Sequence, residues 1–238
     1  LGKLGGRELN FSSDIDILYI YSSDGGETTG VEGTDGSSIG LHAFFVKVSQ
    51  MVTRLISGVT EDGFVFRVDL DLRPEGRSGN IANSIESAEA YYESWGAPWE
   101  RAALIKARPV AGSIELGKMF VEMVKPFVFR RYIDFTAIEE IKSMKEQIDL
   151  SLLRRSPDTI DVKLGPGGIR EVEFFCQALQ LIHGGKNADI RERHTLRALE
   201  KLKAKGLVKA DEASRLADVY IFLRNLEHRI QIVDGRQS

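Results

Sequence analysis

The apolar residues of the N-terminal third first follow the spacing of β-strands. Asp16–Tyr21 reads Asp-Ile-Leu-Tyr-Ile-Tyr, a β-branched and aromatic run that is typical of a buried strand. Gly63–Leu72 is a second strand-like run, and Arg73-Pro74-Glu75-Gly76 after it is typical of a turn. The two segments predict strands of one mixed sheet.

A helix is predicted between these strands. From Leu41 to Ile56 the apolar residues recur every three or four positions and give the segment one broad apolar face. Either Ser37 or Ser38 can cap this helix, which we expect to run to about Ser57. Residues 22–38, in front of it, are rich in Gly, Ser, Thr and acidic residues and have little to bury. We therefore expect a mobile loop there.

Helical spacing dominates the rest of the chain. We expect helices at residues 85–95, 99–107, 114–124, 137–153, 169–183, 195–205 and 211–233. A short strand is expected at Asp161–Leu164, in front of the turn Gly165-Pro166-Gly167-Gly168. The sequence thus predicts an α+β fold, with an α/β catalytic domain over residues 1–110 and a mostly helical domain, a helical bundle, over residues 111–238.

Composition narrows the class of protein. With 42% hydrophobic and 28% charged residues, the 238-residue chain is typical of a globular protein. Its net charge of −3 argues against a protein that coats nucleic acid or an anionic membrane. No apolar run approaches the roughly 20 residues of a membrane span, and charged residues interrupt the start where a signal peptide would lie. Cys176 is the sole cysteine, so we expect no internal disulfide and a cytoplasmic location. Because the chain begins at Leu1, we interpret it as a piece of a longer polypeptide.

Two carboxylates open the first strand. Side chains two apart on a strand point to the same face, so Asp14 and Asp16 project together while Ile15 faces the core. Adjacent like charges repel, and a bound cation commonly stabilises such a pair; oxygen ligands favour Mg²⁺ or Mn²⁺. Asp69 and Asp71 share one face of the second strand, and either could complete the metal site. The alternative, that Asp14 and Asp16 are merely solvated at a strand end, stays open.

The residues before this pair suit a phosphate chain. Gly5-Gly6 predicts a backbone turn with exposed N–H groups and no side chains in the way. Ser12 and Ser13 add hydroxyl donors beside the carboxylates. A glycine turn and two acidic strands are the parts needed to hold two metal ions on a nucleotide during an in-line displacement.

These residues also form a longer pattern. The run Gly2-Lys3-Leu4-Gly5-Gly6-Arg7-Glu8-Leu9-Asn10-Phe11-Ser12-Ser13-Asp14-Ile15-Asp16 resembles the signature of the bifunctional glutamine synthetase adenylyltransferase/adenylyl-removing enzymes. The similarity continues through Asp62 to Asp69, Leu72-Arg73-Pro74, Trp99-Glu100-Arg101, Lys106-Ala107-Arg108, and Lys163 to Phe174. It covers nearly the whole chain. Arg67-Val68-Asp69 and Trp99-Glu100-Arg101 look like the N-terminal half of that family, which removes AMP.

The resemblance implies a fold and a reaction. The fold is that of the nucleotidyltransferases related to polymerase beta. The reaction is phosphorolysis, in which inorganic phosphate attacks the AMP on an adenylylated tyrosine of glutamine synthetase and releases ADP. Adenylylation from ATP, or another nucleotidyl transfer to a signalling protein, is the alternative, and a catalytically silent copy is a third. The PII signalling protein is an expected partner of the full-length enzyme.

The resemblance also implies roles for individual residues. Asp69 matches the third metal carboxylate, and Asp71 departs from the pattern. Asp14, Asp16 and Asp69 are therefore expected to hold the metal, and Gly5, Gly6, Ser12 and Ser13 the nucleotide phosphates. The candidates for a second anion are Lys3, Arg73, Lys106, Arg108 and Lys163.

Three other groups of residues receive structural interpretations. Glu171 and Glu173 begin a helix, where acids commonly favour the helix dipole; the alternative is a contact between domains near the site, made by Arg170 and Glu173. Trp95 and Trp99 are expected in the core or at a domain interface. The four histidines show no ligand spacing, which argues against a zinc site.

Overall fold

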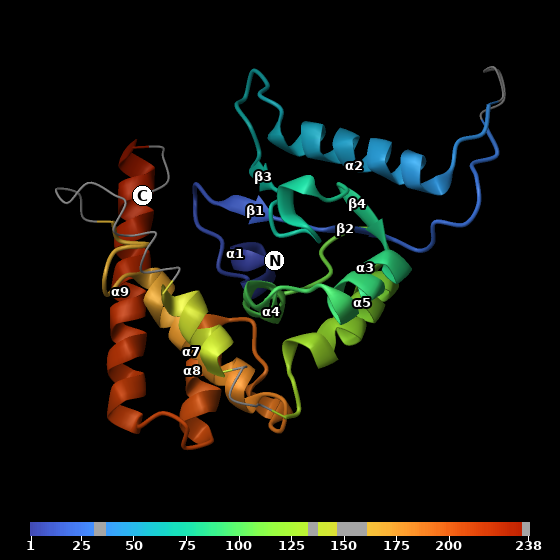
Figure 1. Cartoon of the computed structure of the whole chain (residues 1–238). Helices are drawn as coiled ribbons and strands as arrows, with labels where there is room; N and C mark the ends of the chain where they lie inside the picture. The colour runs from blue at the N-terminus through green and yellow to red at the C-terminus, as the bar shows by residue number, and fades with distance from the viewer. Residues whose placement is uncertain (31–36, 133–137, 147–160, 235–238) are drawn as a thin grey trace.

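A computed structural model describes residues 1–30, 37–132, 138–146 and 161–234. Its elements are α1 (Gly2–Gly6), β1 (Asp14–Asp16), β2 (Tyr19–Tyr21), α2 (Leu41–Ser57), β3 (Arg67–Asp69), β4 (Ala82–Ser84), α3 (Ile85–Ser94), α4 (Pro98–Ile105), α5 (Ile114–Val128), α7 (Ile169–His183), α8 (Thr195–Ala204) and α9 (Ala210–Asp234). Residues 138–146 are also helical. In Figure 1, α7, α8 and α9 lie on one side of the short strands, and α3, α4 and α5 lie below them.

The strands form two small parallel ladders rather than one mixed sheet. β1 pairs with β3, which sets Asp14 opposite Arg67 and Asp16 opposite Asp69. β2 pairs with β4 in the same way. The ladders follow each other along the chain, since only two residues separate β1 from β2. The expectation of a mixed sheet is therefore wrong for the named strands of the described chain.

Both predicted strands are shorter than the sequence suggested. The first divides into β1 and β2, and the second begins at Arg67 rather than Gly63. Phe64 and Val65 are exposed, so the apolar run before β3 does not enter the core. β3 ends where the Asp71 N–H donates to Asp69 Oδ1 at 2.7 Å and so turns back on its own strand. Local side-chain hydrogen bonding thus ends the strand before the predicted turn.

The strand expected at Asp161–Leu164 is wrong. Asp161 Oδ1 accepts hydrogen bonds from the backbone N–H groups of Lys163, at 3.0 Å, and Leu164, at 2.7 Å. An Asp that bonds to the amides after it favours a turn over an extended strand. The segment instead folds back on the start of α7.

The helix predictions fared better. α7 has the predicted bounds, and α3, α4, α8 and α9 lie within two residues of theirs, whereas α5 extends to Val128. α2 begins at Leu41 with Gly40 as its N-cap, so neither Ser37 nor Ser38 caps it. Residues 138–146 confirm the middle of the helix expected at 137–153, and its two ends lie outside the described residues. The expected mobile loop at 22–38 is likewise only partly described, because residues 31–36 fall outside.

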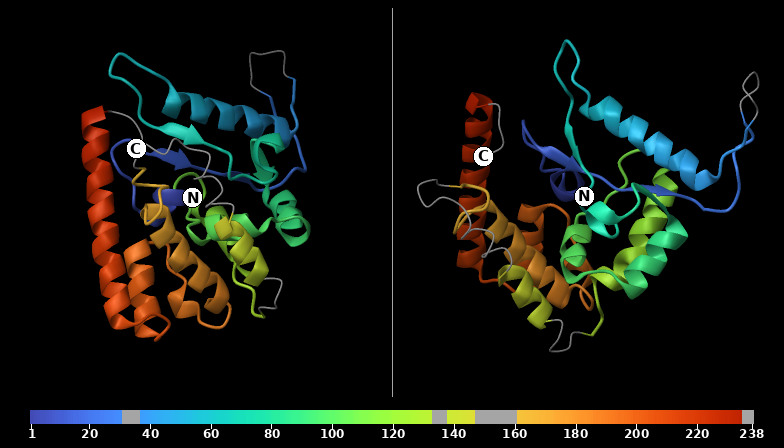
Figure 2. Two further views of the ribbon diagram at one scale, coloured as in Figure 1. Left: turned by 60° about the vertical axis from the view of Figure 1, so that its left-hand side comes forward. Right: turned by 45° about the horizontal axis from the view of Figure 1, so that its top comes forward.

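The apolar face of α2 is only partly covered. The helix lies across β3 and β4 (Figure 2), but Phe44, Val48 and Leu55 stay exposed and only Ser49 is buried. The amphipathic pattern therefore predicted the helix correctly, and its apolar face is left partly exposed. Among the described residues, no helix is long and apolar enough to cross a membrane.

The main core joins the two predicted domains. Its buried side chains come from α3, α4, α5, α7 and the helical residues 138–146. Two smaller clusters hold α7, α8 and α9 together. The boundary at residue 110 stays a prediction, but α5 lies beyond it and packs on α3, α4 and β2. Because the parts share a core, their relative arrangement is fixed around the space between them.

Candidate active site

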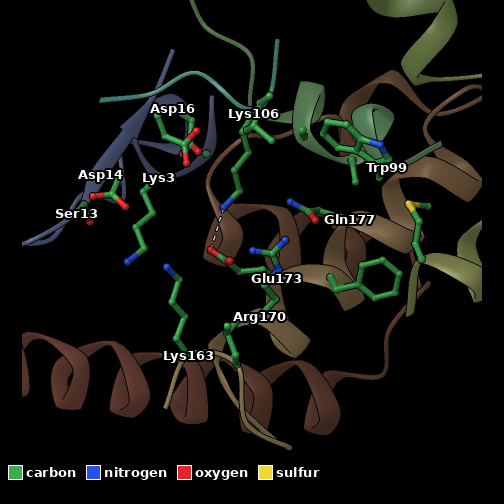
Figure 3. Close-up of a pocket in the computed structure, with 18 residues that line it drawn as sticks. Lys3, Ser13, Asp14, Asp16, Trp99, Lys106, Lys163, Arg170, Glu173 and Gln177 are labelled. Atoms are coloured by element: carbon green, nitrogen blue, oxygen red, sulfur yellow. Dashed lines mark hydrogen bonds and ion pairs between the residues drawn. The ribbon is translucent and has the colours of Figure 1, made fainter. Parts of the chain in front are cut away.

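A cavity of about 660 Å³ lies between the β1–β3 ladder and α4 and α7. Figure 3 shows the side chains around it. Carboxylates from β1 and β3 form one wall, Lys163 and Arg170 extend from the opposite wall, and Trp99 lies toward a more apolar end. The cavity thus combines acidic, basic and aromatic surfaces, as a nucleotide site requires.

The structure brings the three predicted metal carboxylates to the same wall. Asp14 and Asp16 both face the cavity while Ile15 between them is buried, as predicted. The parallel register sets Asp69 beside Asp16, and all three carboxylates line the cavity. Burial raises the pKa of Asp16, and the Asp69 and Asp14 carboxylates raise it further, against the opposing effects of the chain's amino terminus and Lys163. The cluster is therefore electrostatically costly without a nearby cation.

Two of these carboxylates already have partners. Arg67 Nε donates to Asp14 Oδ1 at 2.5 Å, and Asp69 Oδ1 accepts the Asp71 N–H. Within the described residues, no group of three or more acids, histidines or cysteines is arranged to hold a metal ion. The donor set suits Mg²⁺ or Mn²⁺ by its hard oxygens and its strand register, but the side chains are not gathered into a coordination shell.

Asp71 faces elsewhere. It does not line the cavity, and its Oδ2 accepts from Arg77 Nε at 2.8 Å on the exposed surface. This placement fits its departure from the family pattern. Asp71, just beyond the end of β3, is therefore a suitable control for substitutions of the cavity aspartates.

The structure corrects the prediction of an exposed turn at Gly5-Gly6. Both glycines lie buried in the short helix α1, where the Gly5 N–H donates to Leu1 O at 2.7 Å. A Cβ at Gly5 would lie 1.8 Å from the carbonyl oxygen of Lys106, so a helix-to-backbone contact requires this glycine. Neither glycine lines the cavity. Their assignment to phosphates stays a prediction that this geometry does not favour.

Gly2 is the cavity glycine that sequence reasoning missed. It lines the cavity, has a φ of +45°, and a Cβ there would lie 2.0 Å from Asp16 Oδ2. Nothing in the local sequence marks it, since the contact depends on how α1 returns to β1.

We expect Gly2→Ala to displace the Asp16 carboxylate and to lower the free energy of unfolding by about 1–2 kcal/mol, because φ is positive there. Gly112→Ala is the matched control, since Gly112 has a φ of +69° and open space around it. Urea unfolding of both variants separates the collision from the backbone strain. Equal losses in the two variants would show that the contact with Asp16 carries no cost.

The hydroxyl groups of Ser12 and Ser13 are hydrogen-bonded to the protein itself. Ser13 lines the cavity and is buried, and its hydroxyl donates to the side-chain oxygen of Asn10. Ser12 lies outside the cavity lining, and its hydroxyl accepts from Arg67 Nη2 at 3.3 Å. Both serines therefore support the segment that leads into β1.

Four of the five basic candidates are tied to the protein itself. Lys3 lines the cavity but bonds to Glu227 and Asn10, at 2.8 Å each. Arg73 and Arg108 lie outside the cavity lining and donate to backbone carbonyls. The fourth, Lys106, lies in a buried network described next. Lys163 lines the cavity with no such bond among the described residues.

Lys106 joins three parts of the chain. Its ammonium donates to Glu8 Oε2 at 2.8 Å, Glu173 Oε1 at 3.1 Å and Thr195 Oγ1 at 3.4 Å. Tyr220 of α9 donates to Glu8 and Glu173 as well. Of the two residues given the alternative role of a contact between domains, Glu173 bonds to Lys106 across the predicted boundary, and Arg170 makes no hydrogen bond there among the described residues. Glu171 accepts the Gly167 N–H beside the start of α7. The network fixes the floor of the cavity.

Comparison with known proteins now adds to this geometry. Residues 1–123 match the family model described as Glutamate-ammonia ligase adenylyltransferase. The chain belongs to this family. The resemblance found in the sequence is thereby confirmed. Residues 142–238 match a second model, GlnD PII-uridylyltransferase.

Curated members of the family align along the entire chain. The bifunctional glutamine synthetase adenylyltransferase/adenylyl-removing enzyme of Hahella chejuensis is 45% identical over 238 residues, all of this chain and 24% of that protein. Proteins of the same description from Stenotrophomonas maltophilia and Pseudomonas putida are also 45% identical, with 25% and 24% of their lengths covered. The chain thus spans about a quarter of these relatives.

Some residues of the family-like motifs are structural in this fold. Glu100 is buried and accepts the Ala97 N–H at 2.7 Å, which caps α4. Arg101 is fully buried and donates to Val128 O. Trp95 is 79% exposed and Trp99 lines the cavity, so neither lies in the core; their alternative place at a domain interface stays a prediction. A residue's presence in a family-like motif therefore does not show whether it lines the cavity or only stabilises the fold.

Proposed function

We propose that this chain removes AMP from an adenylylated tyrosine of glutamine synthetase by metal-dependent phosphorolysis and releases ADP. The observation that carries the proposal is the register of β1 and β3, which sets Asp16 beside Asp69 in the cavity of a chain from this family. The N-terminal-half character of Arg67-Val68-Asp69 supports the direction. The longer protein is proposed to respond to the PII signalling protein, in line with the match of residues 142–238.

The proposed site residues are those of the acidic wall. Asp14, Asp16 and Asp69 are proposed to hold Mg²⁺ or Mn²⁺, which when bound would neutralise phosphate oxygens and act as a Lewis acid. Asp14 must then exchange its contact with Arg67 for the metal. That ion pair is partly exposed, so its loss costs about 1 kcal/mol or less.

The reaction asks mainly for alignment and charge neutralisation. An oxygen of hydrogen phosphate forms a bond to the phosphorus of AMP, and the bond from that phosphorus to the tyrosine oxygen breaks. The bonding electron pair stays with the phenolate, which takes up the proton from the hydrogen phosphate through solvent. A phenol with a pKa of about 10 is a tolerable leaving group, so no dedicated general acid is needed.

Adenylylation from ATP is the second candidate, because the same cavity could hold ATP and the relatives' names include both activities. Uridylyl transfer to a signalling protein is the third, favoured only by the model match over residues 142–238.

The test is to incubate the chain with adenylylated glutamine synthetase, Mg²⁺ and inorganic phosphate, and to follow ADP by mass spectrometry. We expect ADP only when phosphate is present, and no transfer of label from ATP to unmodified glutamine synthetase. Label transferred from ATP without any phosphate-dependent ADP would reverse the direction. Transfer from UTP to PII would replace the substrate altogether.

A further inference from the structure

Two of the four basic side chains that line the cavity have no carboxylate partner among the described residues. Lys163 and Arg170 line the cavity, and within the described residues their side chains make no hydrogen bond or ion pair. Lys3 and Lys106, the other cavity cations, are both paired with carboxylates. An unpaired ammonium and guanidinium facing one cavity form a site for an anion.

The backbone fixes these two residues beside each other. The Arg170 N–H donates to Lys163 O at 3.0 Å, and the Ile169 N–H donates to Val162 O at 3.1 Å. Gly168 makes this return possible, since a Cβ there would lie 2.7–3.0 Å from the carbonyl oxygens of Gly165, Val162 and Lys163. These bonds occupy the first amides of α7. An anion in the cavity must therefore be bound by the two side chains rather than by the helix terminus.

The pair faces the acidic wall across the cavity. In Figure 3, Lys163 extends toward Lys3 on the side of the cavity where Asp14 and Asp16 lie, and Arg170 extends beside Glu173. Glu173, on the same helix as Arg170, is paired with Lys106, which it shares with Glu8, and Arg170 contributes to its electrostatic environment without an ion pair. Within the described residues neither Lys163 nor Arg170 makes an ion pair, so both side chains can bind an anion in the cavity.

We propose that Lys163 and Arg170 bind the phosphate that attacks the adenylylated tyrosine, and afterwards hold the same group as the β-phosphate of ADP. This inference rests on the proposed function and adds the site of the acceptor. In-line displacement places the entering and leaving oxygens on opposite sides of the phosphorus. Carboxylates on one wall suit the metal-bound transferred group, and cations on the other suit the entering anion. The guanidinium can hold two phosphate oxygens at once.

The test measures binding without turnover. Inorganic phosphate, ADP and AMP are titrated separately into the chain by calorimetry, with EDTA present to remove metal. Lys163→Met and Arg170→Met should each weaken phosphate and ADP binding about 10-fold, and the double variant about 100-fold, as loss of charged hydrogen bonds implies. AMP binding should change less than threefold. Lys118→Met with Lys209→Met is the control, because it removes the same charge from exposed residues outside the cavity.

Several results would contradict the proposed phosphate site or the proposed reaction. Phosphate that binds the double variant as tightly as the parent, or does not bind the parent at all, overturns the acceptor site. An equal loss of AMP and ADP affinity assigns the two cations to the AMP phosphate and also overturns it. A loss equal to that of the control variant reduces the effect to net charge. The variants could weaken phosphate binding as expected although the parent chain yields no ADP from adenylylated glutamine synthetase. That result would refute the proposed reaction and support the anion site.

Discussion

Lys106→Met should lower the free energy of unfolding by about 3–5 kcal/mol, because it leaves Glu8 and Glu173 buried without their cation. Both carboxylates have little exposure, and their hydrogen bonds from Tyr220 and Thr195 come from neutral donors. His194 Nδ1 lies 3.8 Å from Glu8 Oε1, which is a longer contact than the one that Lys106 makes. Urea unfolding followed by circular dichroism measures the loss. Lys118→Met, on the exposed side of α5, should stay within about 0.5 kcal/mol of the parent.

A triple variant separates lost charge from lost packing. Adding Glu8→Gln and Glu173→Gln to Lys106→Met removes the unpaired charges, so part of the stability should return. A single Lys106→Met variant within about 1 kcal/mol of the parent would show that water reaches the network and that Lys106 does not hold α4, α7 and the segment around Glu8 together.

The same network predicts a dependence on pH. Burial alone would raise the pKa of Glu173, but the Lys106 ammonium holds it below its usual range. Burial would lower the pKa of Lys106, but Glu173 and Glu8 hold it above its usual range. The lowered carboxyl pKa gives stability that is present above about pH 4.3 and lost as the pH falls through the folded value. The raised ammonium pKa gives stability that is lost above about pH 10.4. The difference between parent and Lys106→Met should therefore shrink below about pH 4.

The sequence predicted the elements that depend on local pattern. The spacing of apolar residues located α7 and most other helices, and the alternation around Ile15 correctly placed Asp14 and Asp16 on one side. The strand ends were missed because side-chain hydrogen bonds decide them, as at Asp69 and Asp161. A pattern of residue types does not show which amide a carboxylate will accept.

The candidate site was predicted in part for the same reason. Its acidic wall follows from strand geometry, whereas its basic wall depends on which cations the fold leaves unpaired. Lys3 and Lys106 were reasonable candidates by charge, and distant partners such as Glu227 and Glu8 occupy them. Contacts more than 90 residues apart in sequence carry no local signal. Gly2 escaped notice because its role appears only where α1 meets Asp16.

Asp16→Asn should reduce the rate of phosphate-dependent ADP release by about 100- to 1,000-fold, which corresponds to roughly 3–4 kcal/mol of transition-state stabilisation. The amide keeps the size of the side chain but gives up the charge that the metal site requires, at the position that lies opposite Asp69. The fold should survive, because burial already disfavours the charged form of the partly buried Asp16, and its buried neighbour Ile15 holds the strand in place. Circular dichroism and the urea midpoint check that the structure is unchanged.

Asp71→Asn is the matched control for this variant, since Asp71 lies two residues beyond Asp69 and pairs with Arg77 outside the cavity. It should keep at least half of the parent rate. A Mg²⁺ titration adds a second readout: half-saturation should move to higher Mg²⁺ in Asp16→Asn and stay in place in Asp71→Asn. If both variants lose activity equally, or if Asp16→Asn keeps the parent's Mg²⁺ dependence, the acidic wall is not the metal site. The ion pair between Arg67 and Asp14 would then be the interaction that balances the charge of Asp14.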